Sequence, residues 1–230
     1  MAAGVHAGRA LVTGSSSGIG ASIARRLLDD GWQVVGFDHT PATLSASGFS
    51  SVSVDLADAS ALSAAVAEAH GVSALVHAAG YMRVAPLGEL DAEDGAGMWR
   101  LHVHAAALLA DALSPRLPSG GRIVLIGSRT AAGAAGRSQY AATKSALVGM
   151  ARSWAIELAP RGITVNVIAP AATDTPMLHD GSRTSVAPRT PPIGRFVRPE
   201  EVAALTAFVL SHEAAAITGQ QLVICGGSSL

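Results

Sequence analysis

The chain has 230 residues and a net charge of −1 at neutral pH, so we predict one domain spanning 1–230, large enough to bury a substantial core. Its basic residues are scattered, which argues against a nucleic acid or a membrane surface as a partner. The single Cys225 cannot form an internal disulfide, no zinc-ligand spacing exists, and we expect no metal site. Since there is no signal-peptide pattern and no apolar run near ~20 residues, we expect a cytoplasmic protein.

Short apolar runs bounded by turn residues alternate with longer segments of helical period. This alternation predicts an α/β fold, in which a doubly wound, Rossmann-like parallel sheet carries helices on both faces. We expect strands at 10–13, 33–38, 51–54, 74–77, 122–127, 164–169 and 221–224. We expect helices at about 18–30, 59–70, 97–113, 138–158 and 199–211. The connection 39–50 is close to the minimum for a parallel crossover, so its helix should be one turn or absent.

A glycine-rich turn at 13–20 follows the first predicted strand and opens the first predicted helix. Gly14 permits a tight turn, Gly18 lets a pyrophosphate approach the backbone, and Gly20 allows close helix packing. The helix N-terminus adds free N–H groups and positive potential. The phosphate loop of ATPases needs a lysine here, and the only lysine is Lys144. The stretch therefore predicts a dinucleotide turn, with a plain Gly/Ser connection as the alternative.

An acidic residue, Asp38, ends the second predicted strand, where a carboxylate can accept hydrogen bonds from the adenosine ribose hydroxyls. It favours NAD over NADP, because a 2′-phosphate would face its negative charge and neither Ser17 nor His39 is a neutralising arginine. Asp55 and the segment 77–80 follow the next two strands, at the edge where an open α/β sheet builds its crevice.

Lys144 lies four residues after Tyr140, one of two tyrosines in the chain. On a helix these residues share a face, so phenol and ammonium would point into one site. At ~5 Å and an effective dielectric of ~20, the positive charge favours phenolate by roughly 3 kcal/mol, about two pKa units. This would make Tyr140 a general acid/base. The alternative is an exposed lysine on an amphipathic helix.

These motifs occur in one order along the chain: 13–20, Asp38, Asp55, 79–80, Ser128, Tyr140 with Lys144, and 166–170. The sequence thereby resembles the short-chain dehydrogenase/reductases, and the match continues through 173–177, 194–201 and 217–227. The resemblance implies strand order 3-2-1-4-5-6-7 and NAD-dependent interconversion of a secondary alcohol and a ketone. It also implies that Tyr140 shuttles the proton, that Lys144 lowers the phenol pKa and binds the nicotinamide ribose, and that Ser128 polarises the substrate oxygen. Enoyl reductases of the family space Tyr and Lys more widely, which disfavours carbon–carbon double-bond reduction.

The resemblance also implies two sets of contacts. The cofactor contacts are Gly14, Ser16, Ser17, Gly18, Ile19, Gly20, Asp38, His39, Asp55, Leu56, Ala79, Gly80, Tyr140, Lys144, Pro170, Ala171, Thr173 and Thr175. The substrate contacts are Tyr81, Thr130, Gln139, Met177 and Leu178, with a substrate loop at about 176–194 that orders on binding. His179, Arg183 and Arg189 in this loop would meet a carboxylate or phosphate if it folds inward, although such residues are more often solvated loop charges.

The sequence departs from the family at several positions. The family asparagine that holds a water near the lysine aligns with His104, and Asn166 is the only asparagine in the chain. Our hypothesis is that a neutral His104 holds the same water and adds a group titrating near pH 6.5; alternatively its ring fills space or points elsewhere. Ala78 replaces an asparagine that stabilises the central sheet, and Ala171 replaces a glycine, which would narrow the cofactor pocket.

Two predicted helices, 97–113 and 138–158, are apolar over more than one face. Under the resemblance they are dimerising helices, so we expect a homotetramer or homodimer, with a monomer as the alternative. A second class of function stays open. The chain could be an NAD(H)-binding redox sensor or scaffold without turnover, which the missing asparagine and Ala78 favour and which the retained Ser128 disfavours.

Overall fold

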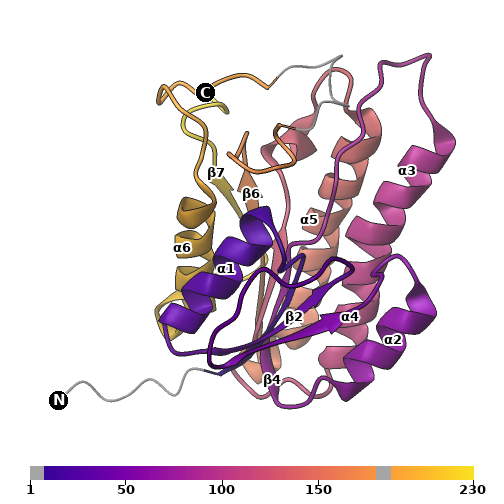
Figure 1. Ribbon diagram of the computed structural model, residues 1–230. Helices are drawn as coiled ribbons and strands as arrows, with labels where there is room; N and C mark the ends of the chain where they lie inside the picture. Colours follow the sequence, from indigo (N-terminus) through magenta and orange to yellow (C-terminus); the bar gives the residue numbers. More distant parts are fainter. Residues whose placement is uncertain (1–7, 180–187) are drawn as a thin grey trace.

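The computed structural model describes residues 8–179 and 188–230. Seven parallel strands form one sheet in the order β3-β2-β1-β4-β5-β6-β7, which confirms the predicted fold class and strand order (Figure 1). The strands are β1 (Arg9–Thr13), β2 (Gln33–Asp38), β3 (Phe49–Ser53), β4 (Val72–His77), β5 (Arg122–Ile126), β6 (Thr164–Pro170) and β7 (Gln221–Ile224).

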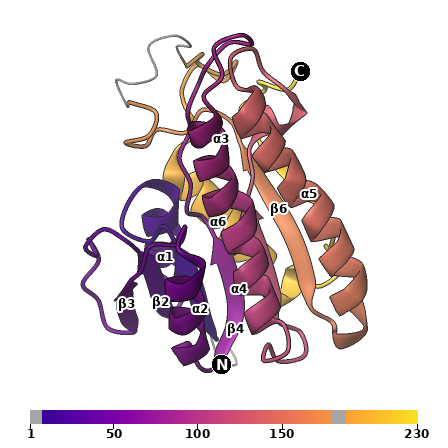
Figure 2. The same cartoon turned by 90° about the vertical axis from the view of Figure 1, so that its right-hand side faces the viewer.

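Helices cover both faces of the sheet. One face carries α1 (Gly18–Asp29) and α6 (Pro199–Leu210), and the other carries α2 (Ala59–Glu68), α4 (Ala105–Leu113) and α5 (Ser138–Leu158) (Figures 1 and 2). Short 3₁₀ segments are η2 (Arg129–Ala132), η3 (Ala159–Arg161) and η5 (His212–Ala214). No helix in the described part of the chain is both long and apolar enough to cross a bilayer.

Two hydrophobic cores lie on opposite sides of the sheet. Alternate residues of β1 enter different cores: Leu11 packs with Leu109 of α4, whereas Ala10 and Val12 pack with Ile23 of α1. This is the side-chain alternation of a strand that is buried on both faces. Because both faces of the sheet are buried, the ends of its strands are held in place. The loops that follow these ends form the functional site.

Two elements differ from the predicted bounds in instructive ways. The predicted long helix starts earlier, as α3 (Ala92–Trp99), because the side chain of Asp91 accepts a hydrogen bond from the Asp94 backbone N–H at 2.9 Å and caps it. Between α3 and α4 the chain forms a π-helical turn, η1 (Arg100–His104), which the sequence pattern does not show. The connection from β2 to β3 contains no helix, as predicted from its length.

Candidate active site

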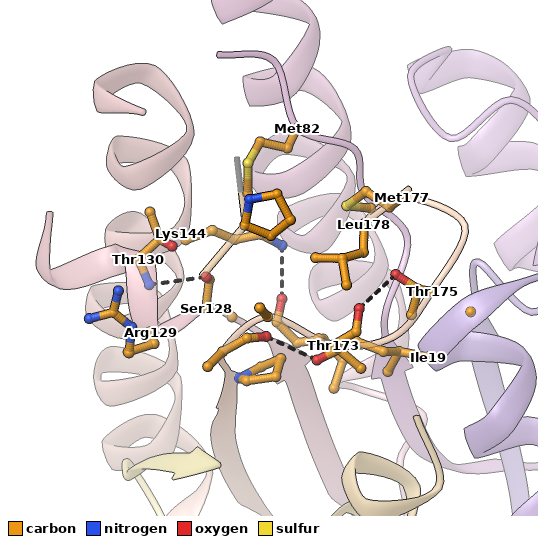
Figure 3. Close-up of a pocket in the computed structure, with 18 of the residues that line it drawn as sticks. Ile19, Met82, Ser128, Arg129, Thr130, Lys144, Thr173, Thr175, Met177 and Leu178 are labelled. Atoms are coloured by element: carbon orange, nitrogen blue, oxygen red, sulfur yellow. Dashed lines mark hydrogen bonds between the residues drawn. The ribbon is translucent and has the colours of Figure 1, made fainter. Parts of the chain in front are cut away.

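A cavity of about 680 Å³ opens at the carboxyl ends of β1, β4, β5 and β6 (Figure 3). The chain leaves β1 towards β2 on one side and later returns to β4 on the other, so the cavity lies where the strand order reverses. In open α/β sheets this switch point is the usual ligand crevice. Turns and loops from six parts of the chain line it, and these loops are described below.

The β1–α1 turn has no room for side chains at two of its glycines. A Cβ on Gly14, whose φ is +68°, would lie 2.9 Å from the backbone of Ala79, and a Cβ on Gly20 would lie 2.1 Å from the Gly14 carbonyl oxygen. Gly18, Ile19 and Gly20, the first residues of α1, face the cavity. Exposed N–H groups at a helix N-terminus favour an anion, so the turn fits a pyrophosphate.

Asp38, the last residue of β2, lies beside this turn and is almost fully buried. Its Oδ1 accepts hydrogen bonds from the backbone N–H and the hydroxyl of Thr40, and its Oδ2 accepts one from the backbone N–H of Ser16. Burial alone raises the pKa of Asp38, but the backbone hydrogen bonds from Thr40 and Ser16 outweigh it, so the pKa lies below its ordinary value. The carboxylate is therefore ionised, and Oδ2 retains a lone pair for a ribose hydroxyl.

Ser128, Tyr140 and Lys144 meet in the cavity, each less than 10% exposed. The Oγ of Ser128 accepts a hydrogen bond from the Thr130 backbone N–H at 3.1 Å, which leaves its own hydrogen free to be donated. Lys144 Nζ lies 5.7 Å from the centroid of the Tyr140 ring and donates to the carbonyl of Ile126 at 2.9 Å. Burial lowers the pKa of Lys144 to about 7.

Beneath this group lies a histidine that the sequence interpretation passed over. His102 is fully buried, and its ring packs edge-on against Tyr140 with centroids 5.6 Å apart. The Tyr81 backbone N–H donates to its Nε2 at 3.1 Å, so the ring proton lies on Nδ1 and is donated to Thr143 Oγ1 at 2.8 Å. Thr143 in turn donates to the Tyr140 carbonyl. Burial and the charge of Lys144 hold the pKa of His102 well below its ordinary value, so it is neutral.

The structure corrects the placement of His104. Its side chain is exposed and lines a separate hollow of about 370 Å³ between α4 and α5, next to Asp111 and Trp154, away from Lys144. The physical reason is the π-helical turn: it inserts an extra residue, which rotates the helix face by about 100°. His102, rather than His104, therefore faces the active site.

A second buried histidine, His77, lies at the end of β4. His77 Nε2 donates to the Leu101 carbonyl in the π-helical turn at 3.1 Å, and its Nδ1 lies 3.0 Å from the hydroxyl of Thr13. The same hydroxyl accepts the backbone N–H groups of Ala78 and Ala79. Burial, with the charge of Lys144, lowers the pKa of His77 to about 3. A neutral imidazole thus joins β1, β4 and the helix, where Ala78 has no side-chain amide to offer.

Most of the expected cofactor residues line the cavity, and some lie outside it. The lining includes Gly14, Ser17, Gly18, Ile19, Gly20, Ala79, Gly80, Pro170, Ala171, Thr173 and Thr175. A second group lies outside this lining and consists of Ser16, Asp38 and His39, with His39 Nδ1 3.5 Å from Asp38. Asp55 is exposed and accepts from the Ala57 backbone N–H, while Leu56 is buried in the core.

Of the expected substrate residues, Thr130, Met177 and Leu178 line the cavity, but Tyr81 and Gln139 do not. The Tyr81 ring lies under the Arg83 guanidinium, and Gln139 donates its amide hydrogen to the Asp91 carbonyl. These local partners hold both side chains on the α3 side.

The charged residues of the loop 176–194 separate in the structure. His179 pairs with Asp174 at 2.7 Å, whereas Arg189 lines the cavity. Arg183 lies outside the described residues. The sequence interpretation missed two further cations of the lining, Arg129 and Arg137, because single arginines beside the catalytic motifs carry no recognisable pattern.

Comparison with known proteins supports the family. A model described as enoyl-(acyl carrier protein) reductase matches residues 14–229. The cyclic-di-GMP-binding biofilm dispersal mediator protein of Escherichia coli K12 is 35% identical over 94% of each chain. D-threitol dehydrogenase of Mycolicibacterium smegmatis is 34% identical over 96% of this chain and 92% of its own.

A solved structure agrees with this assignment. The short-chain dehydrogenase of Burkholderia cenocepacia, crystallised in complex with NADP, is 36% identical, covers 97% of this chain and 98% of its own, and superposes with a TM-score of 0.84. The sequence match and the structural match both extend over nearly the whole length of the chain. The chain belongs to the short-chain dehydrogenase/reductases, a family of oxidoreductases that bind a nicotinamide cofactor.

Proposed function

We propose that this protein is an NAD-dependent oxidoreductase that interconverts a secondary alcohol and a ketone. The observation that carries the proposal is the convergence of Ser128, Tyr140 and Lys144, all buried, on one cavity beside a dinucleotide turn. Simple cofactor binding has no need for Ser128, whose free hydroxyl hydrogen faces the position of a substrate oxygen. The description of the matching family model names enoyl reduction. The four-residue spacing of Tyr140 and Lys144 favours alcohol and ketone chemistry instead.

Each residue has a distinct role in this proposal. When bound, NAD supplies the hydride acceptor, and NADH the donor. The Tyr140 hydroxyl takes or gives the proton of the substrate oxygen as a general acid/base. The Ser128 hydroxyl donates a hydrogen bond to that oxygen, where negative charge develops. Lys144, fixed by the Ile126 carbonyl, favours the phenolate of Tyr140 and binds the ribose hydroxyls.

Asp38 supports NAD as the cofactor rather than NADP. Its carboxylate is buried, ionised and fixed by Ser16 and Thr40, so it offers an acceptor to a ribose hydroxyl and repels a 2′-phosphate. The neighbouring His39 is a weak substitute for an arginine, since its side chain is mostly exposed. The NADP in the Burkholderia structure belongs to that protein.

The test is NADH formation with a panel of secondary alcohols (aryl, alicyclic, hydroxyacyl, polyol and steroid) on the wild type and on Tyr140→Phe. We expect turnover with NAD that the substitution lowers by about 100-fold or more, the usual share of a general acid/base. We also expect kcat/KM with NAD to exceed that with NADP by at least about 100-fold, because like charges at a contact cost several kcal/mol. Equal use of both cofactors would contradict the role of Asp38.

A second candidate is a protein that binds NAD(H) without turnover. It is favoured by one observation: the relative from Escherichia coli carries a name that describes ligand binding rather than catalysis. The two candidates separate experimentally. Tight NADH binding, with no turnover of any alcohol or of the corresponding ketones in reverse, would support the binding protein.

We further propose a homodimer or homotetramer in which α4 and α5 contact a second copy. Ile156 of α5 and Trp99 at the end of α3, which packs against α5, are exposed apolar side chains. Leu108 and Trp154 line the hollow between α4 and α5. Light scattering after size exclusion tests this, and a monomer at micromolar concentration would contradict it.

A further inference from the structure

Among the described residues, the substrate side of the cavity carries basic side chains and no acidic side chain. Arg129, Arg137 and Arg189 lie in the lining with Lys144, and none of the described lining residues is Asp or Glu. The whole chain has 16 Lys and Arg against 17 Asp and Glu, so this segregation does not follow from composition. The arginines keep their charge at every accessible pH. Lys144 does not, since burial brings its pKa to about 7.

Two of these arginines flank the catalytic residues. Arg129 follows Ser128 directly, and Arg137 is the N-cap of α5, three residues before Tyr140. Arg129 Nη1 donates to the Ser228 carbonyl at 3.2 Å, but a guanidinium has five N–H donors, and this bond leaves others for a ligand. Figure 3 shows Arg129 beside Thr130 and Ser128 at the cavity.

Arg137 places a positive charge at the N-terminus of α5, in the lining of the cavity. The N-terminus of a helix itself carries a partial positive charge. An anion in the cavity would therefore be attracted by both the guanidinium and the helix terminus.

The charges of the cofactor do not account for these arginines. The pyrophosphate fits the turn around Gly18 and Gly20, and the adenosine ribose fits Asp38, which lies outside this lining. Met82, Met177 and Leu178 make part of the lining apolar, and Figure 3 shows them across the cavity from Arg129. The substrate region thus pairs an apolar wall with a cationic one.

We infer that the substrate is an amphiphilic anion, namely a secondary alcohol or ketone with an apolar body and a carboxylate or phosphate group. The apolar body packs against Met82 and Met177, while Arg129, Arg137 and Arg189 bind the anionic group. This inference rests on the proposed oxidoreductase function and names the substrate class of the same site.

The test compares acids with neutral partners of the same shape. Each carboxylate, hydroxycyclohexanecarboxylate or hydroxybutyrate, is compared with its primary amide. Glycerol phosphate is compared with glycerol, so that preferences for a carboxylate and for a phosphate are measured independently. For the better anion we expect a kcat/KM about 10- to 100-fold higher than for its neutral partner, the range for hydrogen bonds to a charged group. In Arg137→Gln we expect this preference to fall to within about threefold. The KM for NAD should stay unchanged. Arg25→Gln, which removes an exposed arginine from α1, should preserve the preference.

Two results would overturn the inference while leaving the oxidoreductase intact: neutral partners used as well as anions, or equal losses for both in Arg137→Gln. If no compound is turned over, the same pairs are titrated into the enzyme–NADH complex and followed by NADH fluorescence. Binding of anions that depends on Arg137 would support the anion site and reject the proposed reaction. Equal or absent binding of acids and amides would reject the anion site.

Discussion

His102 connects three segments that must hold still for Tyr140 to act. Its Nε2 accepts from the loop after β4 at Tyr81, and its Nδ1 donates to Thr143 on α5, which donates to the Tyr140 carbonyl. The ring also contacts the Tyr140 ring edge-on. A neutral imidazole is needed here, because a second proton would leave Nε2 facing a backbone N–H donor. His102 is therefore a positioning residue for the catalytic tyrosine.

This role predicts opposite results for two substitutions of His102. A glutamine offers one acceptor and one donor, so His102→Gln should keep kcat within about tenfold of the wild type. His102→Leu leaves the Tyr81 N–H and Thr143 without their partner, at a cost of about 1–3 kcal/mol each, so it should lose stability and lower kcat further. Steady-state kinetics and thermal melts check both variants. His104→Asn, on the exposed side, is the control, and a loss with it equal to that of His102→Leu would contradict the structure.

At the scale of elements, the β1–α1 turn and the pair on α5 could be predicted because their patterns are local. Glycines within one turn and residues four apart on a helix keep their geometry wherever the helix lies. The position of His104 could not be predicted in the same way. One π-helical turn at Arg100–His104 shifts every later residue to a different face, and nothing in the sequence around Val103 announces it.

Tyr81 and Gln139 show a second limit of the sequence. Both lie next to catalytic segments, yet each side chain has a partner from a distant part of the sequence: the Tyr81 ring packs against His102, and Gln139 donates to the Asp91 carbonyl. Such contacts between elements depend on packing that a single sequence does not encode locally. The absence of a helix between β2 and β3, by contrast, could be predicted from the sequence, because the length of the connection alone determines it.

Replacing either of two glycines outside the site by alanine should change the stability of the protein, in opposite directions for the two. A Cβ on Gly149, in the middle of α5, meets nothing within 4 Å, so Gly149→Ala should stabilise the protein by about 0.5–1 kcal/mol. Gly133 also has open space, but its φ is +102°, so Gly133→Ala should destabilise it. Denaturant unfolding of both variants measures the difference. A stabilised Gly133→Ala would show that the turn after η2 has a different backbone conformation.

At the scale of the whole molecule, three buried bases link stability to pH. Folding lowers the pKa of Lys144 from 10.5 to about 7 and that of His77 from 6.5 to about 3, and it also lowers the pKa of His102. The unfolded chain therefore binds more protons, and stability falls as pH decreases through each interval. Without cofactor, we expect thermal stability to decline from pH 10 towards 7 through Lys144, and again below pH 6.5 through the histidines.

Variants separate the two intervals. Lys144→Met should flatten the alkaline part of the stability profile and raise stability most at pH 7 and below, where the wild type keeps a buried ammonium. His77→Gln should reduce the decline below pH 6.5. Melting temperatures of the cofactor-free proteins between pH 4 and 10 check both. A Lys144→Met profile parallel to that of the wild type would mean that the ammonium is not desolvated as the structure indicates.

The most direct test of the account follows the hydride itself. NADH carrying deuterium at the transferable position is mixed in excess over enzyme with the ketone of the best alcohol substrate, and the product is analysed by mass spectrometry. We predict an alcohol that contains one deuterium per molecule with the wild type, and product formation at least about 100-fold slower with Tyr140→Phe. An alcohol without deuterium, or unimpaired transfer by Tyr140→Phe, would contradict hydride transfer at the Ser128, Tyr140 and Lys144 site.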